Sequence, residues 1–174
     1  MTDDLDRVIA AVKELGLHPN IRNYESRFIV QKVAYLLQAL GMPLAYTFTI
    51  HIAGPYSRQL GTEYYQEKGK IKSLETSCRL TPTELEATQK IKRAFGQFND
   101  PNLLECASTM VYFMRQEPEI TDDAILTKIR SIKHHLSDST RTIGLTKAKQ
   151  LLFRPEFVTD DLRKEMEEWD RIDS

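Results

Sequence analysis

The chain has little cysteine and no long apolar run. Only two of its 174 residues are cysteines, Cys78 and Cys106, and their separation fits no metal-binding spacing. The acidic N-terminus lacks the apolar segment of a secretory signal, so we expect reduced thiols and a cytoplasmic protein. No window reaches the ~20 apolar residues that a membrane-spanning helix needs, so we expect no membrane partner.

The chain also lacks net charge and the common catalytic motifs. Its formal net charge of −1 differs from the basic excess of a dedicated nucleic-acid-binding protein. It has no phosphate-binding loop, no dinucleotide fingerprint and no G-x-S-x-G motif. The adjacent His134 and His135 cannot chelate a metal from one helix face, and we expect them on the surface of a helix. We therefore predict no enzyme activity, no cofactor and no metal; an enzyme with an unrecognised site is the alternative.

Length and composition predict one domain over residues 1–174. The hydrophobic fraction of 41% and the charged fraction of 28% are typical of a globular protein. Short loops favour one compact, mostly helical domain, in which we expect a core at about 22–100 and a C-terminal helical extension at about 101–174. The predicted fold class is mainly α with a small β element, an α+β arrangement. We expect about seven or eight helices around a short two- or three-stranded antiparallel sheet.

The strongest local signals lie between Arg27 and Leu60. Apolar residues recur at helical spacing over about 22–40, and we expect Gln31 and Gln38 on the outward face of that helix. Residues 46–52 alternate between apolar and polar side chains, which predicts a strand.

The residues after this strand predict a corner and then another helix. Proline in the Gly54-Pro55-Tyr56-Ser57 corner restricts the backbone, and Ser57 is a suitable N-cap for a helix to about residue 67. Ser57 faintly resembles a nucleophile elbow, but the glycines of that motif are missing. Residues 70–80 alternate loosely and predict one or two short strands that pair with 46–52. Beyond them, capping residues predict helices that start near residues 81, 100, 121, 140 and 159.

Opposite charges gather in two C-terminal segments. Residues 127–149 contain six basic residues and one acidic residue, a net charge of +5. Residues 156–174 contain three basic and eight acidic residues, a net charge of −5. The two segments are either solvated faces that attract each other within the fold or docking surfaces of opposite sign. The basic segment also suits phosphate contacts.

Five tyrosines fall in the central region. They either pack in the core and at its rim or form an exposed patch of the kind that anchors protein interfaces. These tyrosines are Tyr35, Tyr46, Tyr56, Tyr64 and Tyr65.

An ordered set of short motifs resembles one known family. The set is Gln31-Lys32, Tyr35-Leu36, Gly41, Pro43-Leu44, Ile52-Ala53-Gly54-Pro55-Tyr56-Ser57, Leu60, Lys68-Gly69-Lys70-Ile71, Leu80-Thr81 and Glu84. It resembles the Panacea domain, an antitoxin-associated family, over about residues 28–84. The resemblance implies a toxin-neutralising antitoxin or a related adaptor that works by binding a partner protein.

These observations predict a non-enzymatic protein-binding module. The expected partner is a cognate protein toxin or another protein, and the expected partner-binding residues are Gln31, Lys32, Tyr35, Tyr56 and Arg58. The alternative is a nucleic-acid-binding or transcriptional regulator that uses a winged-helix-like element or the basic 127–149 region. A winged helix needs two helices between its first strand and its hairpin, and residues 53–69 have room for one.

Overall fold

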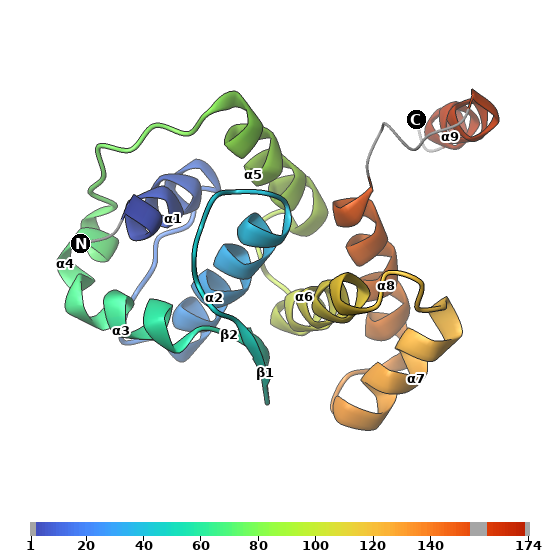
Figure 1. Cartoon of the computed structure of the whole chain (residues 1–174), viewed down its shortest axis with the longest axis horizontal. Coiled ribbons are helices and arrows are strands. Elements are labelled where there is room, and N and C mark those ends of the chain that lie inside the picture. Colours follow the sequence, from blue (N-terminus) through green and yellow to red (C-terminus); the bar gives the residue numbers. More distant parts are fainter. Residues whose placement is uncertain (1–2, 154–159, 173–174) are drawn as a thin grey trace.

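The computed structural model describes residues 3–153 and 160–172 (Figure 1). Within them the chain forms nine helices and one two-stranded antiparallel sheet, which confirms the predicted mainly helical class with a small β element. The elements are α1 (Asp3–Glu14), α2 (Tyr24–Ala39), β1 (Thr49–His51), β2 (Gly54–Tyr56), α3 (Arg58–Gln66), α4 (Lys68–Ser73), α5 (Pro82–Phe95), α6 (Pro101–Gln116), α7 (Asp122–Ile132), α8 (Asp138–Leu152) and α9 (Asp160–Ile172).

Side-chain caps begin most of these helices. Thr81, Asp100 and Thr121 each accept a hydrogen bond from a backbone N–H in the first turn of α5, α6 and α7, as the sequence predicts. Ser57 caps α3 in the same way by accepting from Leu60 N. Ser137 caps α8, which therefore begins slightly earlier than expected.

α2 is the centre of the fold. It contacts α1, α5, α6 and β2, and Figure 1 shows it between these elements. Its residues 30–37 are all buried, so the helix has no outward face over two turns. The prediction that Gln31 points away from the core is therefore wrong. Gln38, which is partly buried, instead binds the backbone of Tyr46.

The sheet is a hairpin with a two-residue turn. β1 and β2 pair in the register Thr49↔Tyr56, Ile50↔Pro55 and His51↔Gly54, so Ile52 and Ala53 form the turn. Residues 46–48 precede β1 and belong to no strand. The predicted strand is thus shorter than expected, and the Gly-Pro-Tyr segment does not end the sheet but forms its second strand.

Residues 70–80 form no strand, and the prediction of strands there is wrong. α4 covers the first part of this segment and buries Ile71 as its one core residue. Leu74 ends α4 in the left-handed conformation (φ 52°), and Glu75 N bonds Lys70 O across the end of the helix. Because α4 and its C-terminal turn pair backbone groups of residues 70–75 locally, this part of the segment needs no neighbouring strand.

α6 and α8 form the most extensive helix pair. Gly144 on α8 lies over Cys106 on α6: a Cβ at Gly144 would lie 2.7 Å from the Cys106 Sγ atom. Burial raises the pKa of the Cys106 thiol to about 12, so this cysteine is an inert core residue. α6 also packs on α2 and β2, which makes it part of the main core although it belongs to the predicted C-terminal extension.

α9 is set apart from the other helices in Figure 1. Trp169 is 64% exposed and Ile172 is 79% exposed on it. The predicted helix start at Thr159 lies outside the described residues. No helix in the described ranges is both long enough and apolar enough to cross a membrane.

Candidate functional site

The five predicted partner-binding residues lie on α2, β2 and α3 but differ in exposure. Gln31, Lys32 and Tyr35 on α2 are buried at 6%, 2% and 4% exposure, so none of them forms an open contact surface. Tyr56 is partly buried at the end of β2, and Arg58 is exposed at the start of α3. The structure therefore brings Gln31, Lys32 and Tyr56 together in one pocket, described below, and leaves Tyr35 in the core against Phe48 and Tyr112.

Lys32 is a buried lysine whose amino group holds the second strand. Its Nζ atom donates a hydrogen bond to the Pro55 carbonyl at 2.7 Å and lies 4.7 Å from the centre of the Phe28 ring. The pKa of Lys32 is lowered to about 7, chiefly because burial penalises the charged form. The Glu105 carboxylate opposes this shift of the pKa, and the Lys133 ammonium adds to it.

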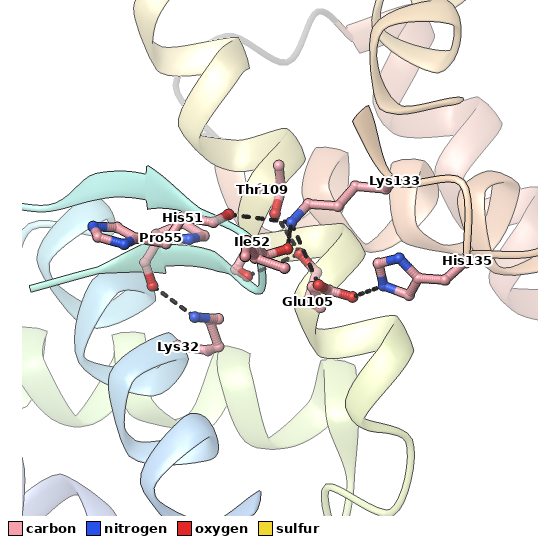
Figure 2. Close-up of polar contacts among 9 residues, drawn as sticks. Lys32, His51, Ile52, Pro55, Glu105, Thr109, Lys133 and His135 are labelled. Carbon is pink, nitrogen blue, oxygen red and sulfur yellow. Dashed lines mark hydrogen bonds and ion pairs between the residues drawn. The ribbon is translucent and has the colours of Figure 1, made fainter. Parts of the chain in front are cut away.

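A second buried lysine holds the hairpin turn. The Lys133 Nζ atom, just past the end of α7, donates to the carbonyls of Ile52 and of His51, the latter at 3.3 Å. It also lies 3.4 Å from Glu105 Oε1, and the other oxygen of this buried carboxylate is 2.7 Å from His135 Nε2. Figure 2 shows Lys32 and Lys133 reaching the hairpin from opposite sides. The hairpin, α2, α6 and the end of α7 are thus joined by one polar cluster.

Gly54 fits where this cluster meets the hairpin. Its φ of +97° is one that L side chains rarely adopt, and a Cβ there would lie 2.8 Å from Thr109 Oγ1 and 3.3 Å from Lys32 Cε. The Thr109 hydroxyl is itself fixed, since it donates to the Glu105 carbonyl at 2.7 Å. The glycine lets α6 and α2 approach the hairpin backbone closely.

Sequence reasoning missed Glu105 and Lys133, but a signal was present. Lys133 follows Ile125 and Ile129 at the spacing of the apolar face of α7, where a charged residue is unusual. Glu105 likewise lies within the apolar face of α6, between Leu104 and Cys106. Charged residues at core positions are almost always paired. A buried ion pair between Glu105 and Lys133 could therefore have been predicted from their positions.

An apolar pocket of about 440 Å³ opens between α2, the hairpin and α3. Gln31 and Lys32 contribute to its wall, together with His51 and Gly54. Five aromatic side chains also line it: Tyr24, Phe28, Tyr56, Tyr64 and Tyr65. We call this feature the tyrosine pocket.

Three exposed apolar side chains surround the tyrosine pocket. Tyr24 is 66% exposed, Ile52 is 93% exposed and Tyr65 is 56% exposed, and all three line it. The Arg27 guanidinium lies at similar distances from two of these rings, 6.0 Å from the Tyr24 centroid and 5.9 Å from that of Tyr65. A cavity with exposed aromatic and aliphatic side chains at its rim is typical of a site that binds an apolar group.

A basic groove adjoins the tyrosine pocket and shares Arg27 and Tyr65 with it. Arg22, Lys68 and Lys72 line this groove as well, and each of them is exposed. No acidic side chain lines either hollow in the described part of the chain. The site therefore combines an apolar hole with a positively charged flank.

The two adjacent histidines do not lie on a helix, where the sequence placed them. α7 ends at Ile132, so His134 and His135 lie in the turn beyond it and not on a helix, although both are exposed as expected. No group of three or more histidine, cysteine, aspartate or glutamate side chains could hold a metal ion among the residues described.

Residues 127–149 do not form one basic face. Lys133 and Arg141 are buried, and Lys149 lies 2.6 Å from Asp122. Arg130 and Arg141 both pair with Asp138. Since much of the positive charge is buried or paired, this segment offers little to a phosphate backbone.

The fold and the site define a mainly helical domain with a small hairpin and a tyrosine-lined pocket beside it. A scan against protein-family models found no match to this chain, and neither did searches of the curated proteins and of the solved structures. The resemblance to the Panacea domain therefore stays a prediction.

Proposed function

We propose that this chain is a non-enzymatic, cytoplasmic protein-binding module of the antitoxin or adaptor type. Its partner inserts an apolar side chain into the tyrosine pocket. The observation that carries this proposal is the coincidence of a 440 Å³ aromatic cavity with three exposed apolar side chains at its rim. Rigid aromatic side chains around a hole are the usual anchors of protein interfaces.

The buried polar groups support binding better than catalysis. Lys32 has a lowered pKa, which is a property of some catalytic lysines. Here the lysine is 2% exposed and its Nζ atom donates a hydrogen bond to the Pro55 carbonyl, so Lys32 supports the pocket wall. Gln31 similarly holds the backbone of Ser57 at the start of α3. A pocket fixed by such groups is pre-organised, which lowers the entropy that is lost when a partner binds.

The test is a calorimetric titration of this protein with the product of the adjacent gene, which measures the affinity. We expect Tyr65→Ala and Tyr24→Ala each to weaken binding by about ten-fold or more, the effect typical of interface anchors. Leu85→Ala is the matched control, because Leu85 is 38% exposed on α5 and does not line the pocket. Arg58→Glu tests whether Arg58 also contributes to binding. Arg58 is the exposed member of the five predicted partner-binding residues and does not line the pocket.

Two results would contradict the proposal. If the neighbouring gene product does not bind, the assignment to the antitoxin or adaptor type loses its support. If it binds Tyr65→Ala and Tyr24→Ala as tightly as the unaltered chain, the partner uses another surface. Equal losses for Leu85→Ala would also reject the pocket.

A further inference from the structure

α9 is an acidic helix with an exposed apolar edge. Trp169 and Ile172 are separated by three positions, so they lie on the same side of the helix, and both are largely exposed. Four exposed acidic residues accompany them: Glu165, Glu167, Glu168 and Asp170. An amphipathic helix of this kind is stabilised when its apolar edge is covered.

The tyrosine pocket and the basic groove match α9 in size and charge. The 440 Å³ pocket lies in the range of about 300–1,000 Å³ that holds drug-sized ligands, so it is large enough for an indole ring. The flank of Arg22, Lys68 and Lys72 matches the acidic side chains that surround Trp169. In Figure 1, α9 and α3 lie at opposite ends of the molecule, so the geometry favours the pocket of another molecule over its own.

We infer that α9 of a second copy of this chain docks on the tyrosine pocket, with Trp169 inserted and the acidic residues along the basic groove. Each copy gives its α9 to the other, which closes a two-fold dimer. The inference rests on the proposed function in that both use the same pocket. Self-association therefore covers the surface that the partner protein needs, and the two binding events compete.

Trp169 is the chain's one tryptophan, so its fluorescence reports on α9 alone. We expect the mass in sedimentation to rise with concentration from 20.1 kDa to about twice that value. Trp169 emission is expected to shift to shorter wavelength over the same concentration range.

Trp169→Ala and the pair Lys68→Glu with Lys72→Glu are expected to raise the dissociation constant at least ten-fold. Ile143→Ala is the control, since Ile143 is 46% exposed on α8 and lines neither hollow.

A mixing experiment tests the docking directly. Tyr65→Ala keeps Trp169 but has a damaged pocket, whereas Trp169→Ala keeps the pocket and contains no tryptophan. We expect dilute Tyr65→Ala protein to emit as an exposed tryptophan and to shift to shorter wavelength when excess Trp169→Ala protein is added. Addition of a Tyr65→Ala/Trp169→Ala double variant is expected to produce no shift, because it offers neither pocket nor tryptophan.

Three outcomes would overturn the inference. They are a monomer with exposed Trp169 at all concentrations, a monomer in which Trp169 is buried by its own chain, and a dimer that Trp169→Ala does not weaken. If one of these occurs while Tyr65→Ala still weakens partner binding, only this inference fails. If Tyr65→Ala abolishes self-association but leaves partner affinity unchanged, the proposed function fails instead.

Discussion

Gln31 and Ser57 are joined by two reciprocal hydrogen bonds. The Gln31 side-chain amide donates to the Ser57 carbonyl at 2.9 Å, and its oxygen accepts from the Ser57 N–H at 2.9 Å. Gln38, about two turns further along α2, binds the backbone of Tyr46 in the same two-way manner, at 2.9 and 3.2 Å. α2 thus holds both ends of the segment that contains the hairpin. At each end a glutamine side chain pairs with a backbone N–H and a backbone carbonyl, as a neighbouring strand would.

Replacing Gln31 by leucine tests how much its two hydrogen bonds to Ser57 contribute to stability. The Ser57 N–H and carbonyl would lose their partners in a buried environment, so we expect Gln31→Leu to lower the free energy of unfolding by about 3 kcal/mol. Gln38→Leu is the matched control. Because Gln38 is only partly buried, water can replace its bonds, and we expect a loss of about 1 kcal/mol. Urea denaturation measures both values, and equal losses would contradict the argument.

The sequence predicts the fold well where local signals agree with burial. Thr81, Asp100 and Thr121 begin helices because a capping side chain acts within one turn. Residues 70–80 show the limit of this reasoning. Their weak alternation does not distinguish a strand from a six-residue helix that buries Ile71 alone, and only the tertiary packing of α4 decides it.

The site was predicted only in part, for a related reason. A periodic pattern predicts that the polar residues of a helix face solvent. In α2 some of them are buried instead, because other elements surround the helix. Gln31 and Lys32 are therefore polar residues of the core, paired with backbone groups of residues that lie 26 and 23 positions away in sequence. Tyr24, which was not among the predicted residues, lines the pocket because it begins α2 beside the hairpin turn. Such long-range pairs leave no local pattern.

Glu105 and Lys133 are expected to be strongly coupled. Lys133→Met would leave the Glu105 carboxylate buried without its ammonium partner, and breaking a buried pair costs about 3–5 kcal/mol. Glu105→Gln removes the charge that needs this partner. We therefore expect the double variant to be more stable than the sum of the two single losses predicts, by about 1–3 kcal/mol. A double-mutant cycle in urea measures the coupling, and additive losses would show that the pair does not interact.

Two helical glycines are expected to respond in opposite directions to alanine. At Gly144 the new Cβ would meet the Cys106 Sγ atom at 2.7 Å and the Cys106 Cβ atom at 3.2 Å, so the Cys106 side chain or the two helices must shift. We expect Gly144→Ala to destabilise the protein by about 1–3 kcal/mol. Gly69 on α4 has no atom within 4 Å of the corresponding position, and Gly69→Ala is expected to stabilise by up to about 1 kcal/mol. Thermal unfolding compares them; a neutral Gly144→Ala would contradict the close α6–α8 contact.

Lys32 makes stability depend on pH in a defined window. Its pKa is lowered from 10.5 to about 7 in the folded protein. Below pH 7 the ammonium is protonated in the folded and unfolded chain alike, so the lysine adds no pH dependence. Between pH 7 and 10.5 the unfolded chain holds a proton that the folded chain lacks, so the free energy of unfolding rises with pH.

Lys32→Met removes this titration and retains much of the side-chain volume. We expect the free energy of unfolding of the unaltered protein, minus that of Lys32→Met, to increase by about 2 kcal/mol from about pH 7 to about pH 9. The same difference is expected to be flat between about pH 5 and about pH 6, where Lys32 is charged in both states. Urea denaturation at each pH gives the difference, in which loss of the Pro55 hydrogen bond is a constant offset. Parallel curves from pH 7 to 9 would show that Lys32 keeps its proton when the protein is folded.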